Sequence, residues 1–374
     1  MKSPFLKRLL SGGLALASLS THAQTADDIV HLNQIQVIGT HNSYHAGIAE
    51  NEKKLWLPQH AEQLSLLNYK HPSLTAQLSG GVRQLELDVF GDKAGGRYTD
   101  PAGPKMVAAA GLPADPPFDP KHLMNEPGFK VMHLQDIDYR SVCQPFTACL
   151  EEIREWSKAH PHHVPLFILV EPKEDALKLG LPTVVPEPFD RAAFDALDRE
   201  ILSVFPRNEI VMPDDIRGTY PTLNDAVTHN GWPTLEQSRG KVVFLLDPPK
   251  MAAVYRDGHP SLAGRVLFTN SNAGEPDGAF IEINTPDVAQ IGKLVHDGYL
   301  IRTRTDDGTV EAMHNDTRRR DTALASGAQI ISTDYPGAEP ASTGFKVEIP
   351  GALPARCDPV NAPSACHNAQ LDAH

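Results

Sequence analysis

The chain has 374 residues, with 34 Lys and Arg against 47 Asp and Glu, which gives a formal net charge of −13 at pH 7. A chain of this length can bury one large core or two ordinary ones. The acidic balance argues against nucleic acid as a partner and against general adhesion to anionic membranes.

The first 23 residues have the composition of a secretory signal peptide. Basic residues at positions 2, 7 and 8 precede an apolar run from Leu9 to Leu19, and Thr21-His22-Ala23 follows. The apolar run is too short to span a bilayer. We therefore predict a signal peptide over residues 1–23, cleaved near Ala23, and a secreted or periplasmic protein. A retained N-terminal anchor is the alternative.

Nine short runs of β-branched or apolar residues predict strands, and helical patterns lie between many of them. Strands that alternate with helices indicate a parallel α/β fold, here a single-domain (β/α)8 barrel over residues 24–340. Nine runs are one more than such a barrel needs, so we expect the sixth or the seventh to lie outside it. The expected strands cover residues 35–39, 82–90, 131–134, 166–170, 242–246, 266–268, 280–283, 299–303 and 329–333.

Three helices have clear signals. Residues 147–159 carry apolar side chains along one face, and Asp190 can cap a second helix with the same pattern. Thr285-Pro286-Asp287 begins a third helix, which Gly298 ends. Residues 91–128 are rich in Gly and Pro without periodicity, which predicts a lid, a binding loop or a disordered segment.

Residues 341–374 are expected to form a C-terminal tail that packs on the surface. Two of the four cysteines lie in this tail, and none of the spacings matches a zinc motif. In an exported protein the simplest interpretation is two local disulfides, with other pairings open. The favoured pairs are Cys143–Cys149 and Cys357–Cys366.

Polar side chains end several expected strands, where a barrel of this kind carries its catalytic groups. Glu86 and Asp88 are two residues apart in one strand, so both face the barrel interior. Inward carboxylates without a partner repel each other, and a divalent cation would offset their charge. Together with Asn42 and Glu171 they offer four oxygen donors, which suit one calcium ion.

Basic side chains end the same strands. His41 and His133 each stand beside a predicted metal ligand, and two such histidines can serve in-line phosphoryl transfer. Lys173, Arg302 and Arg304 are predicted to bind phosphate or sugar hydroxyls. The alternatives are structural ion pairs. These would join Glu86 or Asp88 to Arg83 or Lys173, and Arg302 or Arg304 to Asp306, Asp307 or Asp334.

In this order along the chain, the motifs resemble the catalytic barrel of phosphatidylinositol-specific phospholipases C. The family places a His-Asn pair on the first strand, Glu-x-Asp on the second, His on the third and Glu on the fourth. Two later blocks, residues 299–306 and 326–336, resemble a calcium-dependent bacterial and fungal branch. The matching residues are His41-Asn42, Gly81–Asp88, His133 and Glu171.

The resemblance implies a calcium-dependent phosphodiesterase that cleaves phosphatidylinositol-type lipids. Attack by the inositol 2-hydroxyl would give a cyclic phosphate. His41 would stabilise the transition state and His133 would protonate the leaving diacylglycerol oxygen, while Glu86 is our candidate for the base. The calcium ligands would be Asn42, Glu86, Asp88 and Glu171.

We further expect a phospholipid substrate, a transient contact with the membrane surface, a monomer and no nucleic acid partner. The alternative is an enzyme similar to glycerophosphodiester phosphodiesterase or sphingomyelinase D, which share the barrel and a metal-bound carboxylate set. Those enzymes usually carry Arg after the histidine of the first strand, where this chain has Asn42. A ligand-binding barrel without catalysis is the third interpretation.

Overall fold

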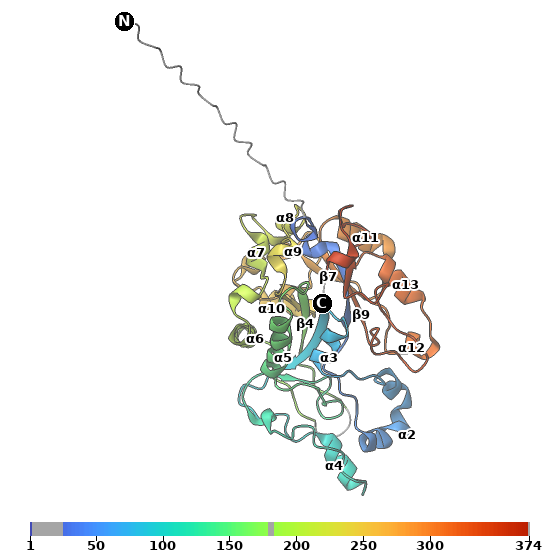
Figure 1. Cartoon of the computed structure of the whole chain (residues 1–374). Coiled ribbons are helices and arrows are strands. Elements are labelled where there is room, and N and C mark those ends of the chain that lie inside the picture. Colours follow the sequence, from blue (N-terminus) through green and yellow to red (C-terminus); the bar gives the residue numbers. More distant parts are fainter. Residues whose placement is uncertain (2–24, 179–182, 373–374) are drawn as a thin grey trace.

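Parallel strands form a barrel in the computed structural model, which describes Met1 and residues 25–178 and 183–372 (Figure 1). Eight strands of the described residues pair in the order β6-β5-β4-β2-β1-β9-β8-β7. A bridge between Asn270 and Phe280 brings β6 beside β7 and nearly closes the ring. The barrel strands are β1 Ile35–Thr40, β2 Gln84–Phe90, β4 Leu166–Lys173, β5 Val242–Leu246, β6 Phe268–Thr269, β7 Phe280–Glu282, β8 Leu300–Arg304 and β9 Ile330–Thr333.

The predicted barrel is confirmed, but the assignment of its extra strand was wrong. Both 266–268 and 280–283 contribute short parallel strands, β6 and β7. The strand outside the ring is β3, Lys130–Val131, which pairs antiparallel with the end of β2. It follows a long excursion that leaves β2 and returns alongside it, so its direction is reversed.

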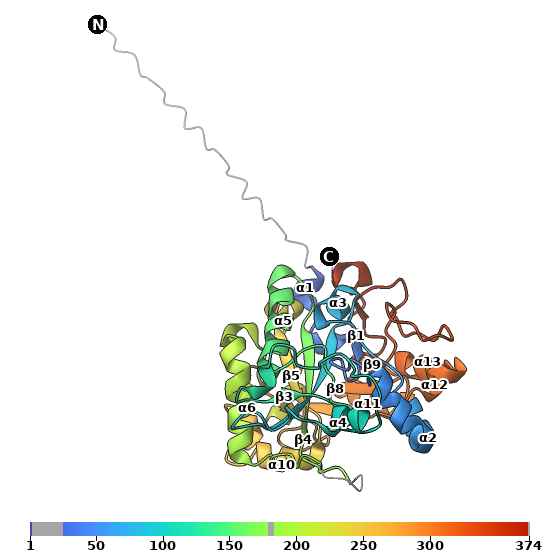
Figure 2. The same ribbon diagram turned by 90° about the horizontal axis from the view of Figure 1, so that it is seen from below.

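Helices surround the barrel, as the view along its axis shows (Figure 2). At the lower end in Figure 1, α2 and α4 extend from the loops after β1 and β2, so this is the end at which strands terminate. The helices are α1 Ala26–Ile29, α2 Glu50–Leu66, α3 Leu74–Ser79, α4 Ala102–Ala109, α5 Phe146–Ala159, α6 Arg191–Val204, α7 Pro213–Arg217, α8 Leu223–Val227, α9 Leu235–Ser238, α10 Pro249–Tyr255, α11 Val288–His296, α12 Val310–His314 and α13 Arg318–Ala325. No helix in the described part of the chain is both long and apolar enough to cross a membrane.

The three predicted helices are confirmed as α5, α6 and α11. The Asp190 carboxylate accepts a hydrogen bond from the backbone N–H of Ala193 and caps α6. Asp287 caps α11 in the same way, and Gly298 follows its end with φ of 100°. The loop expected at 91–128 contains α4 and a 3-10 turn, and it packs against α2.

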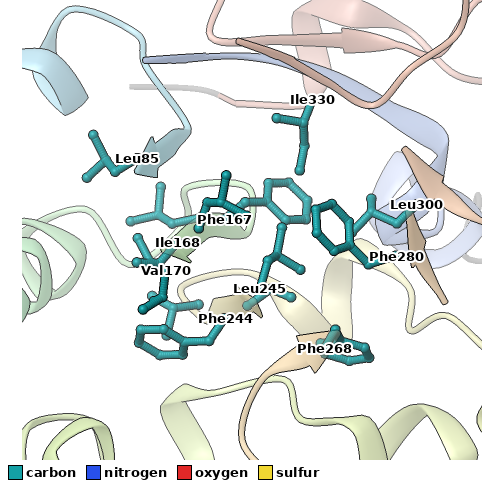
Figure 3. Packing of buried hydrophobic residues seen from close by; sticks show 14 of the residues in the cluster. Leu85, Phe167, Ile168, Val170, Phe244, Leu245, Phe268, Phe280, Leu300 and Ile330 are labelled. Atoms are coloured by element: carbon teal, nitrogen blue, oxygen red, sulfur yellow. The ribbon is translucent and has the colours of Figure 1, made fainter. Parts of the chain in front are cut away.

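The barrel interior is apolar near the starts of the strands and charged toward their ends. Side chains alternate in and out along each strand, and the register places Phe167 and Leu245 on the inner face with Glu86. Figure 3 shows Phe167, Leu245, Phe280 and Leu300 converging inside the barrel. All four are fully buried, so the charged layer at the ends of the strands packs against a close-packed apolar layer.

The predicted disulfides, Cys143–Cys149 and Cys357–Cys366, are both present. The second lies in the tail, where β10, Ala355–Cys357, adds antiparallel to β1. The tail is therefore an extension of the sheet. The boundary at residue 340 and the boundary at residue 24 stay predictions, and the signal peptide lies outside the described residues except for Met1.

The segment that begins at residue 25 and the C-terminal tail meet at the end of the barrel opposite α2 and α4. The guanidinium of Arg239, just before β5, donates to the Asp27 carboxylate and to the backbone oxygen of Leu371 at 2.7 Å. Near the same end, the Arg83 guanidinium is fully buried and its Nε donates to Asp372 at 2.6 Å. Arg83 therefore faces away from the predicted site, and its alternative pairing with Glu86 or Asp88 was wrong.

Candidate active site

A ring of charged side chains covers the charged end of the barrel. Every barrel strand except β6 contributes a side chain to this ring, because the inward-facing residues at or just after the C-terminal ends of these strands are polar. Gly39 allows this packing near β1, since a Cβ there would lie 1.9 Å from Gln84 Oε1. The contributors, with residues directly after a strand included, are His41, Asn42, Glu86, Asp88, Glu171, Lys173, Asp247, Glu282, Arg302, Arg304 and Asp334.

Three of the four predicted calcium ligands lie together. Oxygens of Glu86, Asp88 and Glu171 are all within 4.8 Å of one another, because Asp88 stands opposite Glu171 in the ladder between β2 and β4. Lys173 Nζ lies among them, 2.6 Å from Glu171 Oε1 and 3.1 Å from Asp88 Oδ2. The alternative pairing of Lys173 with Asp88 is therefore present in the structure.

These carboxylates fit a hard cation. Asp88 is fully buried, yet neither of its oxygens accepts a well-formed hydrogen bond from any described residue. Such oxygens are costly unless a cation neutralises them, and carboxylates are the ligands that calcium prefers. The residues present therefore suit the ion that the sequence predicted.

Asn42, the fourth predicted ligand, is held by two tyrosines. It adopts a left-handed backbone conformation with φ of 45° just after β1. Its side-chain Nδ2 donates to the Tyr69 hydroxyl at 2.7 Å, and the Tyr44 hydroxyl donates to its Oδ1 at 3.1 Å. These contacts fix the amide with its oxygen toward Tyr44, whose pKa is raised by burial and by the neighbouring Asp88. The carbonyl oxygen of Asn42 thus faces the Tyr44 hydroxyl, which lies near Asp88.

Burial perturbs the carboxylates of β2. It raises the pKa of Glu86 to about 7, although Arg302 opposes the shift. It also raises the pKa of Asp88 well above the usual range, against the opposing charge of Lys173. Burial lowers the pKa of Lys173, but the charges of Asp88 and Glu171 outweigh it, and the net shift is upward. Without a metal ion, the cluster therefore depends on Lys173 and Arg302 for its neutralisation.

His41 is oriented by Asp334, the residue after β9. The Asp334 carboxylate accepts from His41 Nδ1 at 2.8 Å and lies 3.5 Å from Arg304 Nη2, so the alternative pairing of Arg304 with Asp334 is present in the structure. His41 Nε2 faces Glu86 Oε1 at 3.7 Å. Burial, with the charges of Arg304 and Arg302, holds the pKa of His41 well below its usual value. Its Nε2 is thus a proton acceptor in the neutral ring.

His133 reaches the same end by a different route from the one expected. It does not end a barrel strand, but follows β3, whose antiparallel pairing leads the chain back along β2. Asp138 accepts from His133 Nδ1 at 2.8 Å and from His45 Nε2 at 2.8 Å. This buried carboxylate has a lowered pKa, because the two imidazoles outweigh the effect of its burial. His133 keeps its Nε2 for other partners.

Arg302 is enclosed by carboxylates. Its Nη2 donates to Glu86 Oε2 at 2.6 Å, and its Nη1 lies 3.6 Å from Glu282. Burial raises the pKa of Glu282, and Asp247 adds to the shift. Arg304 differs, because its Nε and Nη2 find no hydrogen-bond acceptor among the described residues. Of the two arginines, Arg304 has the freer donors.

Sequence reasoning missed several residues that shape the site. Asp138, His45 and Tyr69 lie in loops, where no periodicity indicates which side chains turn inward. The positions of Asp247 and Glu282 in the sequence could have predicted that they belong to the site. Each stands at the end of an apolar strand, as Glu86 and Glu171 do.

The comparisons with known proteins agree with this geometry. A family model for Ca2+-dependent phosphoinositide phospholipase C matches residues 30–359. The structure resembles an apo calcium-dependent phosphoinositol-specific phospholipase C from a Pseudomonas species, with a TM-score of 0.51, 16% identity and coverage of 89% of this chain and 97% of that one. A myo-inositol complex of such an enzyme has a TM-score of 0.50 and 16% identity, and covers 90% of this chain and 100% of that one. At this identity the structures show the fold. No curated protein sequence matches.

Proposed function

Because this chain belongs to the family of Ca2+-dependent phosphoinositide phospholipases C, and is therefore a phosphodiesterase acting on phosphatidylinositol-type lipids, we propose that it cleaves them at the charged ring. The inositol 2-hydroxyl forms the new O–P bond and the bond to the diacylglycerol oxygen breaks, which leaves a cyclic phosphate. One observation carries this proposal. Two histidines near a three-carboxylate cluster each have Nδ1 held by a buried aspartate, so each keeps Nε2 for the substrate.

The proposed metal site consists of Asn42, Glu86, Asp88 and Glu171. One calcium ion, when bound there, lowers the pKa of the attacking hydroxyl and offsets charge on the phosphoryl oxygens. The buried oxygens of Asp88, which accept no well-formed hydrogen bond from the described residues and lie 3.1 Å from the Lys173 ammonium, support this assignment. The position of the Asn42 oxygen beside Tyr44 supports the inclusion of the amide.

Three side chains share the proton transfer and the stabilisation of charge. His133 gives its Nε2 proton to the departing diacylglycerol oxygen, while Asp138 stabilises the protonated ring. Glu86, with a pKa raised to about 7, takes the proton of the 2-hydroxyl. His41 lies beside this carboxylate, with its Nε2 3.7 Å from Glu86 Oε1. Its ring, held at Nδ1 by Asp334, faces the phosphoryl oxygens and, when protonated, stabilises their charge.

Phosphate and headgroup contacts fall to basic residues of the ring. Arg304 is the best supported, since its Nε and Nη2 make no hydrogen bond to a described residue, although Nη2 lies 3.5 Å from Asp334. Arg302 forms ion pairs with Glu86 and Glu282. We therefore assign it two roles, which are to position Glu86 and to contact the substrate. Lys173 reaches the site from the end of β4.

Export, a monomeric state and transient membrane contact belong to the same proposal. Two disulfides are typical of proteins outside the reducing cytosol. The signal-like composition of residues 1–23 supports cleavage near Ala23.

The test is release of water-soluble product from phosphatidylinositol vesicles, with calcium or with chelator. We expect calcium-dependent release of cyclic inositol phosphate, and a loss of about a hundredfold or more in His41→Ala and His133→Ala. His296→Ala, an exposed residue of α11, is the matched control and should keep full activity. Full activity in His133→Ala would contradict the acid assignment. Release of sn-glycerol 3-phosphate would favour the glycerophosphodiesterase alternative.

A further inference from the structure

Lys173 lies where the proposed metal ion has to bind. Its ammonium group touches Glu171 at 2.6 Å and Asp88 at 3.1 Å, and oxygens of these residues and Glu86 lie within 4.8 Å of one another. Every ion that bridges Asp88 and Glu171 must occupy the space between the same two side chains. The structure therefore contains an internal cation in the metal site.

The ammonium and a calcium ion exclude each other. Calcium binds carboxylate oxygens at roughly 2.3–2.6 Å, and a lysine ammonium contacts them at about 2.7–2.9 Å. If both contacted Asp88 and Glu171, the two cations would be only a few ångströms apart. Their repulsion at that distance is strong even at the effective dielectric of a partly exposed protein site.

The register between β2 and β4 allows the Lys173 side chain to leave the carboxylate cluster. In the strand register, Asp88 stands opposite Glu171 and Phe90 stands opposite Lys173. The backbone of Lys173 therefore lies two residues nearer the mouth, by which we mean the open end of the barrel where the strands terminate. The side chain thus reaches back down toward the cluster. About a quarter of it is exposed, while Asp88 is fully buried. Rotation of its flexible stem can carry the ammonium toward the mouth without any movement of the strand.

We propose that Lys173 is an exchangeable counter-ion, which occupies the carboxylate cluster in the calcium-free enzyme and leaves it when calcium binds. The proposal rests on the proposed calcium site. In the calcium-free state the lysine neutralises Asp88 and Glu171 and keeps the barrel end stable. After exchange, its ammonium stands at the mouth, where the phosphodiester oxygens arrive. Calcium binding then also places the Lys173 ammonium where it can contact the phosphate.

Calcium titration of the substrate-free protein tests the exchange. In Lys173→Met no ammonium has to be displaced, so we expect calcium to bind about tenfold more tightly than in wild type by calorimetry. In chelator, Lys173→Met should melt at a lower temperature than wild type, because its carboxylates lack a counter-ion. Lys250→Met is the control, since Lys250 is exposed and pairs with Asp175 at 3.3 Å, outside the cluster.

Chemical labelling tests the movement in the wild-type protein, where no variant has to fold. We expect acetic anhydride to modify Lys173 faster with calcium than with chelator, as measured by peptide mass spectrometry. Modification of Lys250 should not depend on calcium. An unchanged calcium affinity in Lys173→Met, or a calcium-independent labelling of Lys173, would overturn the exchange while leaving the proposed function intact. Absence of calcium binding by wild type would overturn the proposed metal site itself.

Discussion

Each of the two histidines of the site is held by a buried carboxylate. Asp334 holds His41 and Asp138 holds His133. The sequence could predict Glu86 and Asp88, because a spacing of two in a strand fixes a common face. It could not predict Asp138, because the loop that returns it to His133 has no repeating geometry.

The raised pKa of Glu86 makes the calcium-free protein sensitive to pH. The folded state keeps this proton up to about pH 7, whereas the unfolded chain loses it near pH 4.5. The folded state thus binds more protons between these values, and the free energy of unfolding falls as the pH rises through this window. We expect Glu86→Gln to flatten that fall in chelator, measured by thermal unfolding from pH 4.5 to 7.

The exposed Glu62→Gln on α2 serves as the control and should follow the wild-type profile. Parallel profiles for wild type and Glu86→Gln would contradict the assignment of the shift to this carboxylate. With calcium present the order should reverse, because Glu86→Gln removes a proposed ligand. Its gain in melting temperature from calcium should be smaller than that of wild type.

At the scale of elements, the helices with capping signals and a continuous apolar face were predictable, and α2 was not. Its 17 residues contain Pro58 and show no clear apolar stripe, so periodicity could not reveal it. The direction of β3 was equally hidden, because a run of apolar residues does not show whether the chain has turned back. Contacts with distant parts of the chain determine both the formation of α2 and the direction of β3.

One such contact fastens α2 to the loop after His133. The Tyr139 hydroxyl donates to Glu52 Oε1, which also lies 3.3 Å from Arg140 Nη2, and both Tyr139 and Glu52 are buried. We expect Tyr139→Phe to lower the free energy of unfolding by about 1–2 kcal/mol, because a buried carboxylate loses a donor. Urea denaturation measures this. Tyr220→Phe, at a partly exposed ring, should cost less than about 0.5 kcal/mol, and equal costs would refute the argument.

At the scale of the whole molecule, alternation of strands and helices predicted the barrel, but not how the tail joins it. The three residues of β10 are too few for a pattern, and their partner strand lies about 320 residues earlier in the chain. At the same end of the barrel, Asp372 in the tail neutralises the buried Arg83. The tail is thus part of the folded unit.

Loss of Asp372 should therefore destabilise the whole barrel. Asp372→Ala leaves the Arg83 guanidinium buried without its carboxylate, which costs about 3–5 kcal/mol in comparable cases. Asp257→Ala removes an exposed partner of Arg191 and should cost less than about 1 kcal/mol. Thermal and urea unfolding compare the two variants. A similar small loss in both would show that the tail contributes little to the fold.

The meeting of Asp27 and Leu371 at Arg239 has a practical consequence. After the predicted removal of residues 1–23, Asp27 and Leu371 would stand near the two ends of the remaining chain, and ends this close can be joined by a short linker for circular permutation. Both ends lie on the face away from the charged ring. An enzyme immobilised through either one would present its mouth outward, free to approach a lipid surface.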